Sequence, residues 1–436
     1  MRLLGACAAL SLLCLAAVQA APKDEIYDEQ ELIPLQGSYL RGWRDNYDNV
    51  FAPRFTEEER RRLARVEFRM ERRLPGFEPF AFLYRRDLNQ VIVSAASLLF
   101  LDDVMYAYAW LNVKGYDIQS VGDYLMMLRY WDPGRGRPPK PLDALCIKRD
   151  PADQKVADFA ARGFNIAVVF ALLHDYGHAF HGHEGNAAGA PAVSRINEEA
   201  ADRFALDVIA RTGEVPIGVT ELFFTMAYLF ENRADFASDA AYQQTLAART
   251  HPLSPQRLQA FAQHLSSSSG AYAEAFKPGA KASAMLLAQM IQSLALRVAD
   301  DGTQRFSAMI GQTVSQDDLA PRQKGVHLAP PCRARTATSQ SFDGYHRGQV
   351  VLGRTPFTVD SVFERYGDTV SGSYSYGAGF GRLKGEVRGD TLTYRWSMGR
   401  ASGSGVLTLK DGSYRGTFGS GTANTGDGTI TISKAQ

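Results

Sequence analysis

Residues 157–180 read ADFAARGFNIAVVFALLHDYGHAF, and this stretch decides the fold of the chain around it. Apolar side chains cover almost the whole circumference of the helix that the spacing predicts, as far as His174, so we expect a long helix buried in the core. His174 and His178 stand four residues apart near its end. At about 100° per residue the two imidazoles lie one turn apart on one face, where they can share a metal ion.

A second predicted helix, Asn197 to Arg211 (NEEAADRFALDVIAR), carries Glu198 and Asp202 one turn apart, beside an apolar stripe. Glu198 would join the two histidines to give a two-His, one-carboxylate set, which leaves a fourth position open for water, as a catalytic zinc ion requires. We expect Asp202 to accept a hydrogen bond from the second nitrogen of one ligand histidine.

These residues resemble the gluzincin type of zinc metallopeptidase, whose signature is H-E-x-x-H followed by E-x-x-A-D on a second helix. The matching residues are His174, His178, Glu198 and the pair Ala201-Asp202. The stretch THPLSPQRL, residues 250–258, is similar to T-H-P-x-x-x-x-R-[LI] in the branch that includes CAAX-processing and heat-shock membrane proteases. The resemblance spans about residues 164–264 and implies a zincin-like fold, a bound Zn²⁺ and hydrolysis of a protein or peptide substrate.

The chain departs from the signature at the residue that would be the catalytic base. Asp175 stands where the family has Glu, and its side chain is one methylene shorter. A shift of about 1 Å in a catalytic carboxylate can cost on the order of a hundredfold in rate. Two outcomes stay open: Asp175 acts as the general base through a rearranged water, or the peptidase site is impaired.

Three alternatives to a zinc peptidase remain. The His-Asp pair at 174–175 also resembles the HD phosphohydrolase motif, but that family needs a histidine ligand upstream and this chain has none before His174. The His and carboxylate residues of the two helices can instead form a polar network without metal, because any one H-x-x-x-H is weak evidence. A catalytically inactive zincin-fold binding protein is the third alternative.

Histidines outside the motif give weaker signals. His251 precedes Pro252 at a predicted helix start, and we expect a structural role, with stabilisation of a transition state as the alternative. His181 and His183 are expected in a loop or around the ligand residues.

The ends of the chain and its composition bear on location and partners. Residues 1–20 have the charged start, apolar run and small-residue end of a signal peptide, which predicts a periplasmic or secreted protein. The remaining cysteines, Cys146 and Cys332, can form one disulfide or stay free. No later segment reads as the roughly 20 apolar residues of a membrane span. With 48 basic and 47 acidic residues, the chain gives no sign of a nucleic-acid partner.

We therefore predict an α+β protein: a mainly helical zincin-like metallopeptidase domain over 21–312, a linker over 313–340, and a small all-β domain over 341–436. Alternating runs and turns such as Asp411-Gly412 predict the β domain. Two roles stay open for the β domain: a purely structural one, or binding of a cell-envelope ligand. Further predictions are an extended leader over 22–54, a charged helix over 57–73, a strand over 89–95 followed by a helix over 97–111, a Pro/Gly loop over 133–141, and helices over 217–234, 254–264 and 281–300.

Overall fold

The structure is a computed structural model. It describes residues 25–435 except 133–135, 184–190, 249–250, 276–278, 313, 315–318, 326–340, 377–378 and 399–400. The predicted signal peptide, residues 1–20, lies outside the described residues.

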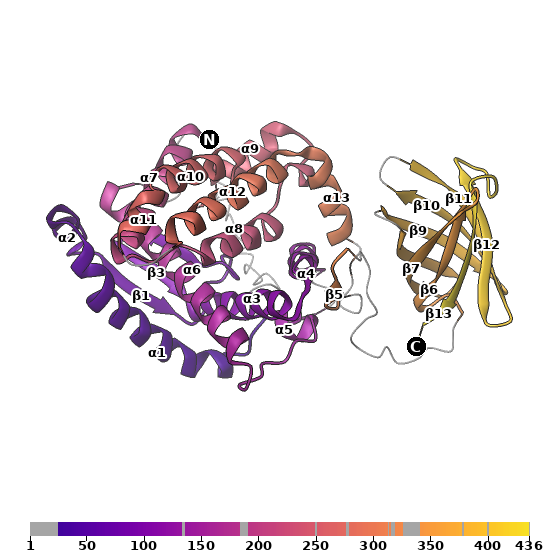
Figure 1. The fold of residues 1–436 in the computed structure, drawn as a ribbon, viewed down its shortest axis with the longest axis horizontal. Coiled ribbons are helices and arrows are strands. Elements are labelled where there is room, and N and C mark those ends of the chain that lie inside the picture. The colour runs from indigo at the N-terminus through magenta and orange to yellow at the C-terminus, as the bar shows by residue number, and fades with distance from the viewer. Residues whose placement is uncertain are drawn as a thin grey trace, which may run out of the picture.

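Helices form most of the first part of the chain (Figure 1). In chain order they are α1 (Glu29–Asn46), α2 (Glu57–Leu63), α3 (Ala95–Lys114), α4 (Gln119–Arg129), α5 (Pro141–Ala144), α6 (Gln154–His181), α7 (Pro191–Thr212), α8 (Gly218–Leu229), α9 (Asp239–Ala248), α10 (Pro255–Ser267), α11 (Ser269–Ala275), α12 (Ala280–Ala299) and α13 (Asp301–Gly311). Short non-α helical turns lie at Tyr47–Phe51, Ala52–Arg54 and Arg233–Asp235.

The central prediction, a long helix over 157–180, is confirmed as α6. The helix over 197–211 is confirmed within α7, which begins six residues earlier. The prediction over 217–234 is wrong at its end, because α8 stops at Leu229.

A three-stranded sheet lies beside these helices, formed by β1 (Glu67–Glu71), β2 (Phe82–Arg85) and β3 (Gln90–Ser94) in the order β1-β3-β2. The predicted strand-then-helix unit is confirmed as β3 followed by α3. The prediction of a charged helix over 57–73 is wrong in its second half, because α2 ends at Leu63 and β1 follows it. Val66, Phe68 and Met70 alternate with charged residues, and this period of two belongs to β1, whose parallel partner is β3.

The predicted extended leader is also wrong, because most of it is helical. Asp28 and Glu31 form a capping box at the start of α1, which satisfies two backbone N–H groups. Leu32 and Trp43 are then buried, Trp43 against the ring of Tyr176 on α6. The leader is therefore part of the core.

Two helices are long and apolar enough, by length and composition, to cross a membrane: α6 and α12. This corrects the expectation that no segment reaches that length. Just over half of the apolar window of α6, 56%, is buried inside the protein, and helices of a protein core pass the same test. The finding is weak evidence for a membrane span.

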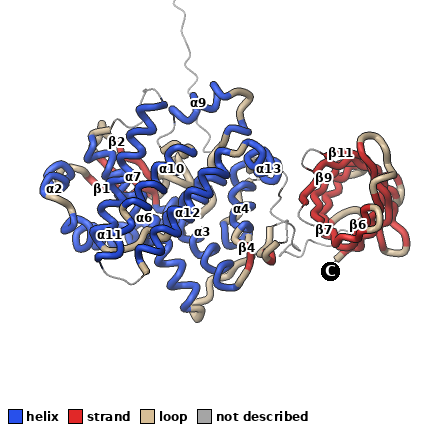
Figure 2. The backbone as a smooth tube through the Cα atoms, turned by 45° about the horizontal axis from the view of Figure 1, so that its top comes forward, coloured by secondary structure: helices blue, strands red, loops and turns tan. Residues whose placement is uncertain are grey.

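The C-terminal part is all-β, as predicted. Its eight strands form a closed antiparallel barrel in sequence order (Figure 2), with β13 pairing to β6. They are β6 (Gly344–Leu352), β7 (Thr355–Tyr366), β8 (Thr369–Tyr376), β9 (Gly379–Arg388), β10 (Thr391–Met398), β11 (Ala401–Lys410), β12 (Ser413–Ser420) and β13 (Gly428–Lys434). Asp411 and Gly412 both have positive φ, as a two-residue hairpin turn requires.

Part of the predicted linker is attached to the helical part. β5 (Arg322–Gln323) pairs with β4 (Tyr116–Asp117), and Arg322 forms an ion pair with Asp123 of α4 at 2.6 Å. The predicted domain boundaries stay predictions. Cys146 is disulfide-bonded, and Cys332 lies outside the described residues.

Candidate metal centre

The candidate site lies where α6 and α7 approach closely. A Cβ atom on Gly177 would stand only 2.9 Å from Cα of Ala201, so the glycine lets the two backbones approach closely. The turn of α6 that holds Gly177 also holds His174 and His178, and Ala201 lies between Glu198 and Asp202 on α7. The two histidines therefore face the two carboxylates.

The structure brings His174, His178 and Glu198 together. Nε2 of His178 lies 3.0 Å from Nε2 of His174 and 3.1 Å from Oε1 of Glu198. Nε2 of His174 lies 3.4 Å from Oε2 of Glu198. All three side chains are buried.

His251 stands in this cluster, which corrects the expectation of a structural role. Its Nδ1 lies 3.1 Å from Nε2 of His174 and 3.5 Å from Oε2 of Glu198. Ligand atoms of His174, His178, Glu198 and His251 lie within 4.8 Å of one another, so these four residues can hold one metal ion. The T-H-P stretch was the only signal in the sequence for His251. Spacing along a helix could not show that a residue 53 positions after Glu198 lies beside it.

Each imidazole uses its other nitrogen on a neighbouring group. Nδ1 of His174 lies 2.8 Å from Oδ1 of Asp202. Nε2 of His251 donates to the carbonyl oxygen of Phe82 in β2 at 3.0 Å. Nδ1 of His178 lies 3.0 Å from Nδ1 of His183. Such contacts favour the tautomers that leave the inward nitrogens with free lone pairs, as metal ligands need.

Arg257, at the start of α10, binds the carboxylates of Glu198 and Asp202 on α7. Its Nε and Nη2 donate to the two carboxylate oxygens of Asp202, each at 2.8 Å, and its Nη1 lies 2.5 Å from Oε2 of Glu198. The side chain is only 3% exposed. Arg257 lies in the stretch 250–258 that resembles the T-H-P-x-x-x-x-R pattern, and nothing in that stretch predicted this role for it.

The pKa values follow these charges. Burial alone would raise the pKa of Glu198, but the charges of Arg257, His251 and His174 outweigh it and hold this pKa well below its usual range. Burial would likewise raise the pKa of Asp202, and Arg257 lowers it. For His174 both effects have the opposite sign. Burial lowers the pKa of its imidazole, but the negative charges of Glu198 and Asp202 outweigh burial and raise this pKa to about 9. A metal ion that binds Nε2 of His174 would therefore displace a proton.

Asp175 is completely buried and lines the cavity beside the cluster. Neither of its carboxylate oxygens has a hydrogen-bond partner among the described residues, although Nε2 of His251 lies 3.4 Å from Oδ1. Burial raises the pKa of Asp175 to about 6, against the lowering effect of His251 and His174. A carboxyl group with this pKa can take up and release a proton near neutral pH.

The formal charges of the cluster favour a divalent cation. With the imidazoles neutral, as metal ligands must be, Asp175, Glu198 and Asp202 contribute three negative charges when ionised and Arg257 contributes one positive charge, which leaves two negative charges among buried groups. Uncompensated buried charge is costly. One divalent ion among the inward donors would balance it, and three imidazoles with one carboxylate suit Zn²⁺ and other late first-row metals.

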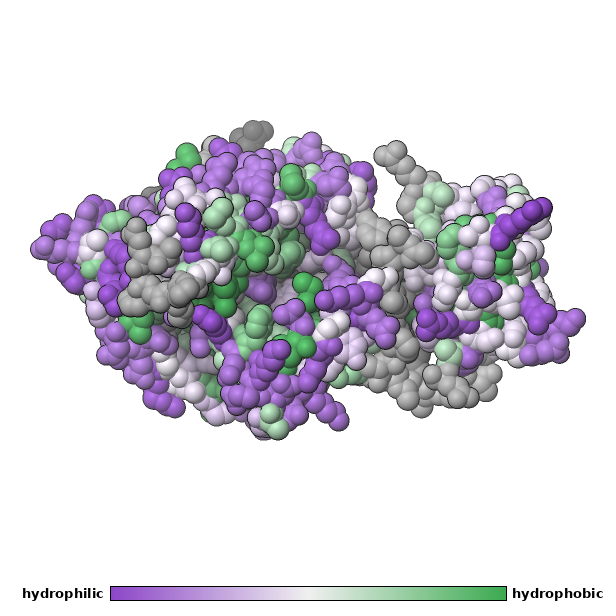
Figure 3. All heavy atoms as spheres, in the orientation of Figure 1, coloured by the Kyte–Doolittle hydropathy of each residue, from purple (hydrophilic) through white to green (hydrophobic). Residues whose placement is uncertain are grey.

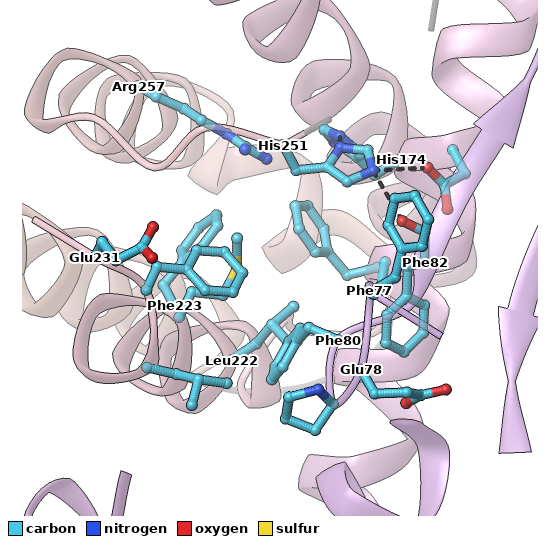
Figure 4. A pocket seen from close by; sticks show the side chains of 18 residues that line it. Phe77, Glu78, Phe80, Phe82, His174, Leu222, Phe223, Glu231, His251 and Arg257 are labelled. Atoms are coloured by element: carbon cyan, nitrogen blue, oxygen red, sulfur yellow. Dashed lines mark hydrogen bonds and ion pairs between the residues drawn. The ribbon is translucent and has the colours of Figure 1, made fainter. Parts of the chain in front are cut away.

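A cavity of about 500 Å³ opens beside the cluster, with His174, Asp175, His251 and Arg257 in its lining. Figure 4 shows His174, His251 and Arg257 along one side and Phe80 and Leu222 along the opposite side. In Figure 3, hydrophobic residues gather at the recessed centre of the helical part, close to α3 and α8, within a hydrophilic periphery.

One comparison with known proteins gives a match. Residues 118–277 match the family described as Peptidase U49. Neither the curated proteins nor the solved structures include a match. The matched segment is less than half of the chain, but it holds every residue of the candidate metal cluster and Asp175, Asp202 and Arg257. The match indicates a peptidase family for this segment, and peptidases act on peptides or proteins.

Proposed function

We propose that this chain is a zinc-dependent peptidase with a gluzincin-type, zincin-like site. The observation that supports it most strongly is the convergence of three imidazole nitrogens and the Glu198 carboxylate beside a cavity that His174 and His251 line, within the segment that matches a peptidase family. In this proposal the metal ligands are His174, His178, Glu198 and His251.

In this proposal the residues around the metal ligands have separate roles in hydrolysis. A zinc ion held here would polarise the scissile carbonyl and lower the pKa of water. Asp175 would accept the proton of the attacking water and deliver it to the leaving amine. Asp202 orients His174, and Arg257 keeps Glu198 and Asp202 ionised.

We also propose that the protein is exported to the periplasm or secreted. Two observations support this: residues 1–20 have the pattern of a signal peptide, and Cys146 is disulfide-bonded. Disulfides persist mainly in oxidising compartments.

The test of the proposed function is metal removal. The purified mature protein should contain about one zinc ion per chain by elemental analysis, and it should cleave denatured casein. Dialysis against a chelator should abolish cleavage, and added Zn²⁺ should restore it, because the proposed reaction needs the metal ion to polarise the scissile carbonyl and to lower the pKa of water. Cleavage that survives removal of all metal would exclude the proposal.

His251 also favours a second candidate, an inactive metal-binding protein. Four protein donors fill a tetrahedral site, as in structural zinc centres, whereas catalytic sites keep a position open. Zinc bound at one per chain without any peptide cleavage would support this candidate.

The Asp175→Glu variant distinguishes the zinc peptidase from the inactive metal-binding protein. Its longer side chain should bring the carboxylate about 1 Å nearer the metal ligands, and casein hydrolysis should rise by roughly tenfold or more if Asp175 is the general base. Asp175→Asn should lower hydrolysis while zinc is retained. An unchanged or lower rate in zinc-loaded Asp175→Glu protein argues against the assigned role of Asp175.

A further inference from the structure

The cavity beside the metal cluster has an apolar lining contributed by three parts of the fold. The segment before and into β2 provides one wall, α8 provides the opposite wall, and α6 provides the residues next to the cluster. The apolar lining residues are Phe77, Pro79, Phe80, Phe82, Phe170, Ala171, Leu222, Phe223, Met226, Leu229 and Phe230. Figure 4 shows Phe80, Leu222 and Phe223 facing this space.

Most charged groups of the lining belong to the metal end. Of the two other acidic residues in the lining, Glu78 is already satisfied: the backbone N–H of Leu74 and the hydroxyl of Ser97 donate to its two oxygens, at 2.9 and 2.6 Å. Glu231 also has an interaction partner. The cavity away from the metal ligands therefore offers a substrate apolar contact.

The size of the cavity suits a large side chain. At about 500 Å³ it lies within the range of small-molecule pockets. An aromatic or large aliphatic side chain would lose most of its contact with water there, whereas a small or charged side chain would leave apolar walls exposed or be desolvated without a partner.

We infer that this cavity receives a bulky apolar side chain of the substrate, aromatic or large aliphatic, next to the bond that is cleaved. The inference rests on the proposed function, since it assigns the substrate class of the same site. Ala171 and His174 both line the cavity and stand three residues apart on α6, so the bound side chain would lie within reach of the metal ligands.

Cleavage sites in denatured casein, mapped by mass spectrometry, test the preference. Bonds flanked on one side by Phe, Tyr, Leu or Met should be cut at least about tenfold faster than bonds flanked by Gly, Ala or Ser. Ala171→Phe, which fills the cavity, should reduce this ratio by about tenfold or more. The matched control is Ala161→Phe, the same change at an exposed position of α6, and it should leave the ratio unchanged.

Phe77→Asp provides a second variant in case Ala171→Phe does not fold. Phe77 is 44% exposed at the cavity, so the fold should tolerate the change, and the added charge should lower cleavage beside apolar residues. Efficient casein cleavage without any apolar preference would overturn the inference and leave the proposed function standing.

A binding measurement separates the inference from the peptidase proposal. Zinc-loaded protein is titrated in a calorimeter with 3-phenylpropionohydroxamate and with acetohydroxamate, which share a metal-binding group and differ in the apolar part. The phenyl compound should bind at least about tenfold more tightly, and Ala171→Phe should remove the difference. If casein is not cleaved but this difference is present, the proposed function fails, and what stands is that the cavity binds a bulky apolar group beside the metal ligands. Equal binding, or no binding of either compound, overturns the inference.

Discussion

The His178→Ala protein should bind zinc at least about a hundredfold more weakly than the wild type and lose measurable peptide hydrolysis. Zinc sites with four protein donors are worth roughly 10–16 kcal/mol, so the loss of one donor costs about 3 kcal/mol or more. His178 contributes a buried nitrogen that lies 3.0 Å from His174 and 3.1 Å from Glu198. Elemental analysis after dialysis at a fixed free zinc concentration measures the loss.

The matched control is His264→Ala. His264 lies on α10 in an ion-pair contact with Asp207, at 3.0 Å, away from the cluster. Its removal deletes the same side chain and should leave zinc content and hydrolysis near the wild-type values. Circular dichroism should show that both variants keep their helices. Full zinc occupancy in folded His178→Ala protein would rule out His178 as a ligand.

Local patterns were sufficient to predict the two helices of the site. In α6 and α7 the apolar spacing, the pair His174 and His178, and the pair Glu198 and Asp202 all lie within one or two turns of helix. The packing of the two helices depends on Gly177, whose missing side chain lets α7 approach. Secondary structure and side-chain faces follow from such short-range spacing.

The rest of the site depends on tertiary contacts that spacing does not encode. His251 enters the cluster because β2, far away in the sequence, presents the carbonyl oxygen of Phe82 to its Nε2. Arg257 is buried because two carboxylates of another helix surround its guanidinium. In the sequence both belong to the stretch 250–258 that resembles the T-H-P-x-x-x-x-R pattern, but nothing in that stretch shows that they lie beside Glu198.

The same distinction explains the errors in the fold. The charged residues of β1 continue those of α2, and for this reason the sequence predicts a helix there. The alternation of apolar and charged residues in β1 becomes a strand only because β1 pairs with β3. The all-β character of the C-terminal part was easier to predict than the position of β1, since alternation and turn residues such as Asp411-Gly412 are local. Closure of β13 on β6 joins strands about 80 residues apart, which no local signal contains.

Arg257→Met should destabilise the metal-free protein strongly and the zinc-loaded protein much less. In the metal-free protein, removal of the guanidinium leaves Glu198 and Asp202 buried without their main counter-charge. Breaking a buried ion pair in this way costs roughly 3–5 kcal/mol, which in a domain of this size lowers the thermal midpoint by at least about 6 °C. A divalent ion bound to Glu198 would supply positive charge at the same place and stabilise the folded state by mass action.

Circular dichroism at 222 nm follows this unfolding, because the helices dominate the signal. The control is Arg211→Met: Arg211 also binds one carboxylate through two nitrogens, Glu59 at 2.8 and 2.9 Å, but its side chain is 31% exposed. Its removal leaves one carboxylate without its partner in place of two, and Glu59 keeps the hydrogen bond from the backbone N–H of Thr56 at 2.7 Å. The midpoint of Arg211→Met should therefore fall less than that of metal-free Arg257→Met, and by the same amount with and without zinc. Arg257→Met and Arg211→Met should therefore differ most in metal-free protein. An equal loss for Arg257→Met with and without zinc would mean that the metal does not share the carboxylates that Arg257 neutralises, and Glu198 could not then be a ligand.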